Sequence, residues 1–258
     1  MKGPFMCNTR IQELTYTIGS GAGISYRDAE RQSFSNHLGS FEIIDTLLRV
    51  KPTEHFSSEI DARRAIETYL LDWEIEADIT SNIGAIRFSF KESQVVETEP
   101  CHGLERAIRV DSWESAKVSD CVSVQIICHK YPRPPHEFRA TQEVAQAYRR
   151  WKAHHEGKEP LQAMAYFVLT LADTTFGDRS RAADELQIDS KILKEIGRLS
   201  STKGNEITAR KAKPLLEDLS PKEQEWLEKA VRLVIRQLGQ RAAGARLRDL
   251  SMKDLPSL

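Results

Sequence analysis

The sequence lacks a hydrophobic run long enough to cross a membrane. Its longest strongly apolar stretch, residues 161–172, has 12 residues, whereas a transmembrane helix needs about 20. Residues 1–16 contain no apolar segment of signal-peptide length, and they include Glu13. We therefore expect a cytoplasmic protein that has no membrane partner.

Cysteine is also scarce, with 4 among 258 residues, and a chain of this size does not need disulfides. Cys101 and Cys128 are each followed by a histidine, and thiolates and imidazoles are the ligands of tetrahedral zinc sites. However, no two cysteines have the C-x-x-C spacing of a zinc knuckle. The sequence predicts no metal or other cofactor, and it leaves open whether Cys101, Cys121 and Cys128 bind zinc.

Several signatures of enzymes are missing. The sequence contains no H-E-x-x-H, no G-x-S-x-G and no Walker motif. The glycine-rich residues 18–24 lack the Gly-Lys-Ser/Thr that ends a phosphate-binding loop, so they predict a turn or a bulge. No pair of carboxylates is singled out as an acid and a base. An enzyme is therefore the less favoured reading.

The net charge of −1 conceals two unlike parts. Residues 1–137 hold 15 basic and 21 acidic residues, and residues 138–258 hold 22 and 17, so the parts carry −6 and +5. Between them, Pro132, Pro134 and Pro135 favour extended backbone and cannot continue a helix. We predict an acidic domain over 1–137 and a basic domain over 138–258. A rigid loop inside one domain is the alternative.

The acidic part reads as a mixture of strands and helix. Serine and acidic residues at 57–61 predict the start of a helix that runs to Trp73. Residues 73–79 and 86–90 alternate apolar and polar side chains, which predicts strands, with a turn at 91–94. Residues 122–128 are a further strand candidate. The fold class is thus α+β, with a small antiparallel sheet and a helix on its face.

The basic part predicts an all-helical bundle. Apolar residues at helical spacing indicate helices over 141–156 and from Pro160 onward, and the second of these is apolar enough to be the central helix. Ser220 and Glu223 form a capping-box sequence that predicts a third long helix ending near Gly239. Residues after Gly244 are expected to form a frayed tail.

Residues 181–199 resemble a helix-turn-helix. The pattern consists of Ala182-Ala183, Leu186, Ile188, a polar start at Asp189-Ser190, and then Ile192, Leu193 and Ile196. In that motif the second helix can enter the major groove of DNA. Gln187 stands where the turn often has glycine. The expected nucleic-acid-binding residues are Lys191, Lys194, Arg198, Lys203, Arg210, Lys211 and Lys213. A purely structural helical hairpin is the alternative.

Two overlapping Arg-x4-His spacings, Arg149/His154 and Arg150/His155, resemble the signature of the HEPN family. These compact helical bundles include many metal-independent ribonucleases and many inactive or structural members. The resemblance implies that arginine holds a phosphate while histidine transfers protons. The family's motif usually lies on a late helix with a polar residue after the arginine, whereas here Trp151 follows Arg150. Favourable placement of cations at a helix C-terminus is the alternative explanation.

These observations lead to one preferred function and two alternatives. We expect a non-catalytic interaction or regulatory protein whose helical part contacts a partner, with RNA, DNA, another protein or a second copy of the chain left open. The first alternative is a HEPN-like ribonuclease that uses Arg149, Arg150, His154 and His155 as catalytic residues. The second is a helix-turn-helix regulator that binds DNA.

Overall fold

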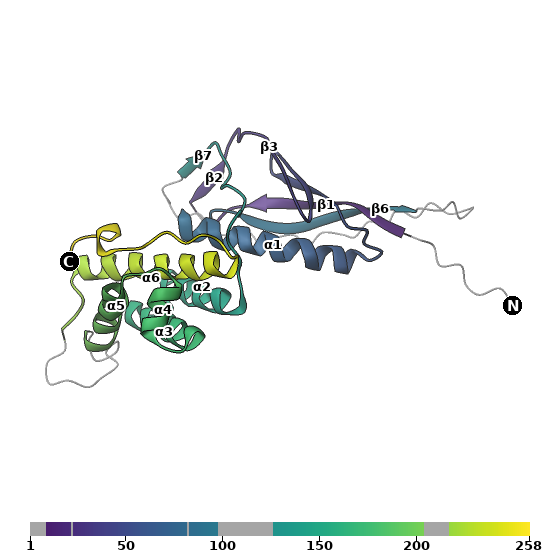
Figure 1. Ribbon diagram of the computed structural model, residues 1–258. Coiled ribbons are helices and arrows are strands. Elements are labelled where there is room, and N and C mark those ends of the chain that lie inside the picture. Colours follow the sequence, from purple (N-terminus) through teal and green to yellow (C-terminus); the bar gives the residue numbers. More distant parts are fainter. Residues whose placement is uncertain (1–8, 22, 82, 98–125, 204–216) are drawn as a thin grey trace. The chain divides into compact units, whose positions relative to one another are not determined.

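The computed structural model describes residues 9–21, 23–81, 83–97, 126–203 and 217–258. The chain divides into two compact units, residues 1–134 and 135–258, and the division falls inside the proline-rich run. The first unit combines an antiparallel sheet with one long helix, and the second unit is helical (Figure 1). The predicted α+β class is confirmed.

Five strands form the main sheet of the first unit, in the order β3-β4-β5-β1-β6, and all neighbours are antiparallel. Their bounds are β1 Thr9–Gly19, β3 Gln32–Asn36, β4 Gly39–Ile44, β5 Leu47–Pro52 and β6 Arg87–Glu97. A separate parallel pair joins β2 (Ile24–Tyr26) to β7 (Ile126–Cys128), which lies at the end of the predicted strand 122–128. Of that prediction, residues 122–125 lie outside the described part of the chain.

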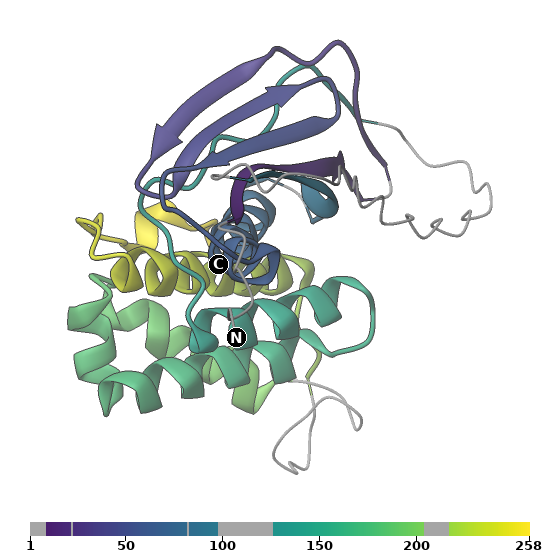
Figure 2. The same ribbon diagram turned by 90° about the vertical axis from the view of Figure 1, so that its right-hand side faces the viewer.

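Helix α1 (Glu59–Thr80) lies along one face of this sheet (Figures 1 and 2). Its buried side includes Ile66, Leu70 and Trp73. Trp73 meets the ring of Phe34 edge-on, with ring centroids 5.5 Å apart, and Phe34 stacks on Phe41 at 4.9 Å. Alternate residues of the strands therefore point toward the helix, as the period of a half-buried sheet requires.

The predicted strand at 73–79 is wrong, because α1 continues through these residues to Thr80. Ile66, Leu70, Trp73 and Ala77 are spaced by three or four residues and are all buried, so they form one continuous helical stripe. No glycine or proline interrupts residues 59–80. The local alternation of apolar and acidic residues is therefore overridden by the longer helical period.

The predicted turn at 91–94 is also wrong, since β6 runs unbroken through it. The strand stays paired with β1 along its length. The register of this pair shifts at two places, between Ile11 and Glu13 and between Thr15 and Tyr16. Such bulges interrupt strict alternation without ending a strand. This explains why the polar residues of β6 look like a loop in the sequence.

A buried carboxylate fixes the connection from α1 to β6. Asp78 is fully buried and accepts hydrogen bonds from the backbone N–H groups of Gly84 (2.9 Å) and Ala85 (3.1 Å). Its second oxygen accepts a 2.5 Å bond from the guanidinium of Arg87. Because both oxygens of the carboxylate accept hydrogen bonds and one donor is a guanidinium, the buried charge is compensated.

The second unit contains five α-helices among its described residues. They are α2 (Gln142–His155), α3 (Leu161–Phe176), α4 (Arg179–Glu185), α5 (Ser190–Thr202) and α6 (Pro221–Ala242). Helix α3 packs against α2, α4, α5 and α6, as expected for the central helix of the unit. Its residues Met164, Ala165 and Val168 are buried, and the core continues through Trp226 and Leu227 of α6.

The residues after Gly244 are not a frayed tail, contrary to expectation. The backbone N–H of Leu250 donates to the carbonyl of Gln187, and the carbonyl of Leu250 accepts from Asp189, both at 2.8 Å. A short 3₁₀ helix (Met252–Asp254) follows, and Leu250 and Leu255 are buried. Two apolar side chains and two backbone hydrogen bonds therefore anchor a segment whose composition is mostly polar.

Candidate nucleic-acid interface

Helices α4 and α5 are short and are joined by the residues 186–189. The small residues Ala182 and Ala183 are buried, which permits close packing of α4 against α5. The side chain of Asp189 caps α5 by accepting a 2.9 Å hydrogen bond from the backbone N–H of Lys191. The start of α5 is therefore fixed in direction by local chemistry.

The turn between these helices has an unusual backbone conformation. Gln187 has φ of 51°, in the left-handed region that residues with a side chain rarely adopt. Its side-chain amide donates to the carbonyl of Asp184 at 2.7 Å, and its own carbonyl accepts from Leu250. These contacts hold a glutamine in a conformation that glycine adopts without strain. They also define the angle at which α5 leaves the turn.

Lys191, Lys194 and Arg198 are exposed and lie on one side of α5, because they are spaced by three and four residues. The side chains of Lys191 and Lys194 form no ion pair with any other described residue. Their charges are therefore directed at solvent. This is the side of α5 that the sequence pattern predicts for binding nucleic acid.

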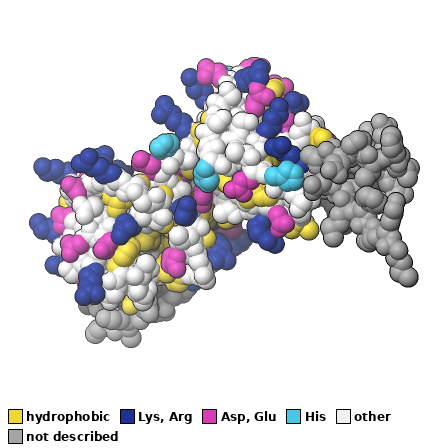
Figure 3. Space-filling view, turned by 45° about the vertical axis from the view of Figure 1, so that its right-hand side comes forward, with side chains coloured by type: hydrophobic (Ala, Val, Ile, Leu, Met, Phe, Trp, Pro, Cys, Tyr) yellow, Lys and Arg dark blue, Asp and Glu magenta, His cyan; other side chains and the backbone are white. Residues whose placement is uncertain are grey.

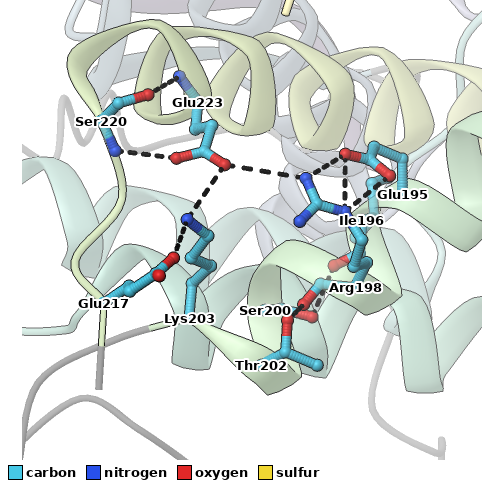
Figure 4. Close-up of polar contacts among 9 residues, drawn as sticks. All are labelled: Glu195, Ile196, Arg198, Ser200, Thr202, Lys203, Glu217, Ser220 and Glu223. Carbon is cyan, nitrogen blue, oxygen red and sulfur yellow. Dashed lines mark hydrogen bonds and ion pairs between the residues drawn. The ribbon is translucent and has the colours of Figure 1, made fainter. Parts of the chain in front are cut away.

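The other two described cations of the predicted set are held by carboxylates (Figure 4). Arg198 contacts Glu195 at 2.5 Å and Glu223 at 3.6 Å. Lys203 contacts Glu217 at 2.8 Å and Glu223 at 3.6 Å. Their positive charge is thus partly neutralised inside the unit. Arg210, Lys211 and Lys213 lie outside the described residues.

Glu223 links this ion-pair network to the start of α6 (Figure 4). Its carboxylate accepts a hydrogen bond from the backbone N–H of Ser220 (2.9 Å), and the hydroxyl of Ser220 accepts from the N–H of Glu223 (3.3 Å). The hydrogen bond from the backbone N–H of Ser220 is the largest cause that lowers the pKa of Glu223, and the positive charges of Lys203 and Arg198 lower it further. The carboxylate therefore stays ionised at neutral pH. Glu223 of the predicted capping box thus also serves as a counter-ion for Arg198 on α5 and for Lys203, which directly follows α5.

On the face shown in Figure 3, basic and acidic side chains are interspersed. No large area of one charge sign covers that face. On that face a polyanion would therefore meet individual lysines and arginines and no broad basic patch.

The Arg–His spacing lies at the C-terminal end of α2, where the side chains contact other groups of the same unit. Arg150 forms an ion pair with Glu159, and its guanidinium lies 4.6 Å from the centre of the Phe167 ring. His154 Nδ1 lies 3.0 Å from the carbonyl oxygen of Glu159. Arg149 is exposed and donates to the carbonyl of Ala145 at 3.3 Å.

His155 is held by a second carboxylate. Its Nε2 lies 3.1 Å from Glu228 on α6, and its ring meets Trp151 edge-on with centroids 4.6 Å apart. The hydrogen bond from His155 lowers the pKa of Glu228. Burial raises the pKa of Glu159, while Arg150 and His154 oppose this shift.

The structure therefore brings Arg150, His154 and His155 to one helix end but directs them toward protein groups. The centroids of the two imidazole rings are 5.5 Å apart, yet each ring has its own partner. Glu159 and Glu228 are the residues that the sequence did not reveal as partners. Glu159 directly precedes Pro160, the expected helix start, but Glu228 lies 73 residues from His155 and no local pattern connects them.

Two adjoining hollows lie along the exposed side of α3. The first has a volume of about 410 Å³ and is lined by Arg150, Gln162, Ala163, Tyr166, Phe167, Thr170 and Ser200. The second has a volume of about 560 Å³ and is lined by Tyr166, Leu169, Arg179, Lys194, Gly197, Arg198 and Ser201. They adjoin because Tyr166 lines both, and the consecutive residues Ser200 and Ser201 line one each. We call the two hollows together the α3 groove.

The predicted cysteine cluster remains largely outside the structure. Cys101 and Cys121 lie outside the described residues, and Cys128, at the end of β7, is a free thiol. Within the described ranges, no group of three or more His, Cys, Asp or Glu side chains is arranged to hold a metal ion. The described helices also include none that is long and apolar enough to span a bilayer.

Comparisons of the chain with protein-family models, with curated proteins and with solved structures give no significant match.

Proposed function

We propose that this chain is a non-catalytic interaction or regulatory protein whose helical unit binds nucleic acid through the exposed side of α5. The observation that carries the proposal is the pair Lys191 and Lys194. Both are exposed, they lie one helical turn apart, and neither has an ion-pair partner among the described residues. Unpaired lysines are suited to phosphate contacts, which supply most of the sequence-independent affinity for nucleic acids.

A specific observation favours duplex DNA as a second, narrower candidate. The turn residue Gln187 adopts the left-handed conformation that a glycine usually supplies in helix-turn-helix segments. Together with the cap at Asp189 and the buried Ala182-Ala183 pair, it gives α5 a fixed, exposed face of the kind that can enter a major groove.

The ribonuclease alternative gains no support from the contacts of α2. A nuclease site needs an arginine and a histidine that are open to a phosphate and a ribose hydroxyl. Here Arg150 is paired with Glu159. Nδ1 of His154 faces the carbonyl oxygen of Glu159, and Nε2 of His155 faces the carboxylate of Glu228. These contacts suit a structural role in joining α2 to the rest of the unit.

The test compares two charge reversals in the full chain. Lys194→Glu changes the proposed face, and Lys222→Glu makes the same change at an exposed lysine in the first turn of α6. Fluorescence anisotropy with labelled single-stranded and duplex oligonucleotides measures affinity at several salt concentrations. We expect Lys194→Glu to weaken binding and Lys222→Glu to leave it nearly unchanged. Equal effects of the two variants, or no binding by the unaltered chain at about 50 mM salt, would refute the proposal.

A further inference from the structure

The two halves of the α3 groove differ in chemistry. The first hollow is mainly apolar and aromatic, whereas the second is lined by three cations. Tyr166 lies at their junction. From Gln162 to Thr170 the groove follows nine residues of α3, or about 12 Å of helix. A ligand that fills it must therefore be longer than a single ring and must differ in polarity at its two ends.

The apolar hollow offers flat surfaces to a planar ring. Tyr166 and Phe167 line it together with the methyl group of Ala163, which is exposed. One side of the Phe167 ring is already covered by the guanidinium of Arg150, 4.6 Å from its centre. Aromatic rings and guanidinium planes are the surfaces on which unpaired nucleobases stack.

A side-chain amide in the same hollow is available to a ligand. Gln162 lines the hollow and is 8% exposed, and its side chain forms no hydrogen bond with another described residue. The amide therefore reaches the hollow with both its donor and its acceptor open to an incoming group. The Gln162 amide carries a donor and an acceptor side by side, and this pair matches the edge of a nucleobase.

The second hollow has the chemistry of a phosphate site. Arg179 is paired with Asp173 at 2.7 Å, and Arg198 is paired with Glu195, so these two arginines are held in place and partly neutralised. Lys194 also lines the hollow and forms no ion pair with a described residue. Lys194 is therefore the charge available to an incoming anion.

We infer that the α3 groove binds one unpaired nucleotide, with its base beside Gln162 and Phe167 and its phosphate against Lys194. The inference rests on the proposed nucleic-acid binding and adds that the nucleotide bound in the groove is not base-paired. A base inside a duplex is stacked and paired, so its edge and face cannot enter the apolar hollow. The nucleotide is either free or part of a single strand, and both sources share this chemistry.

The experiment uses the full chain and two labelled probes, a single-stranded oligonucleotide and the duplex of the same sequence. Gln162→Leu replaces the amide by an apolar side chain of similar size. Gln142→Leu makes the same change at an exposed amide of α2 and is the matched control. We expect the single strand to bind about tenfold tighter than the duplex, the effect of stacking one base. Gln162→Leu should remove most of this preference, and Gln142→Leu should not.

A second variant guards against misfolding of the first. Ala163→Trp fills the apolar hollow from an exposed position, so it should lower single-strand affinity and leave duplex affinity unchanged. If free nucleoside monophosphate displaces the single strand, the site accepts a free nucleotide. If it does not, while the Gln162 dependence holds, the site requires a nucleotide within a strand.

The results separate this inference from the proposed function. If Lys194→Glu weakens both probes but Gln162→Leu and Ala163→Trp change neither, the inference is wrong and nucleic-acid binding stands. Tighter binding of the duplex overturns the inference and favours insertion of α5 into a major groove. If the unaltered chain binds neither probe at about 50 mM salt, both proposals fail.

Discussion

Replacing Lys191 and Lys194 together by alanine should reduce the salt dependence of nucleic-acid binding by about two counterions. Each lysine that neutralises a duplex phosphate contributes about 0.9 to the slope of log affinity against log salt. The double variant should therefore lower the slope by about 1.8 for a duplex and by about 1.4 for a single strand. Between about 50 and 200 mM salt, a slope of 1.8 corresponds to a roughly 12-fold change in affinity.

The matched control is the double variant Arg198→Ala, Lys203→Ala, which removes the same number of charges. Because Glu195, Glu217 and Glu223 already lie within ion-pair distance of these cations, few counterions are released from them when nucleic acid binds. We expect this control to lower the duplex slope by less than about 0.9.

Fluorescence anisotropy titrations of the full-length variants against one labelled duplex give the slopes, and circular dichroism verifies that both variants are folded. The reasoning would be refuted if the Arg198/Lys203 control reduced the slope as much as the Lys191/Lys194 variant does. That outcome would mean that Arg198 and Lys203 contact nucleic-acid phosphates despite the ion pairs drawn in Figure 4.

Three further predictions concern stability. A methyl group at Gly239 would lie 2.1 Å from a ring carbon of Phe138; Gly239→Ala should therefore reduce the free energy of unfolding by about 1–3 kcal/mol in urea titrations, and adding Phe138→Leu should recover part of the loss. Asp78→Ala removes a fully buried carboxylate that accepts from two backbone N–H groups and pairs with Arg87, so it should cost about 3–5 kcal/mol, and a loss below about 1 kcal/mol would contradict the role given to this residue. The hydrogen bond from His155 lowers the pKa of Glu228 below its usual 4.5, so the stabilisation is present above that pH and is lost as the pH falls through the lowered value. Relative to Glu228→Gln, the unaltered chain should therefore lose stability between about pH 5 and pH 3, whereas parallel urea midpoints of the two proteins would show that the bond contributes nothing.

The helical unit is readable from the sequence because its signals are local. The cap at Thr141, the proline before α3 and the Ser220–Glu223 box each lie within a few residues of the helix start that they specify. The sheet is harder to read. Strand β1 pairs with β5 and β6, which are separated from it by dozens of residues, and bulges disturb its alternation.

The candidate site was predicted only in part, for a comparable reason. Spacing on one helix identifies the exposed side of α5, including Lys191 and Lys194. It does not identify Glu223, which lies 25 residues beyond Arg198 and neutralises part of its charge. The α3 groove escaped prediction because Tyr166 and Phe167 occur in a nearly continuous apolar run, where two half-exposed aromatic residues look the same as core residues.

The hydrogen bonds between Leu250 and the turn at Gln187 and Asp189 have a consequence for biosynthesis. Helix α5 ends 48 residues before Leu250, so the nascent chain presents the lysines of α5 before these hydrogen bonds can form. Two of the hydrogen bonds that hold the turn form only when the chain has been made as far as residue 250. A shortened chain that ends near Gly244 would keep every residue of the proposed binding face and still lack these two contacts beneath it.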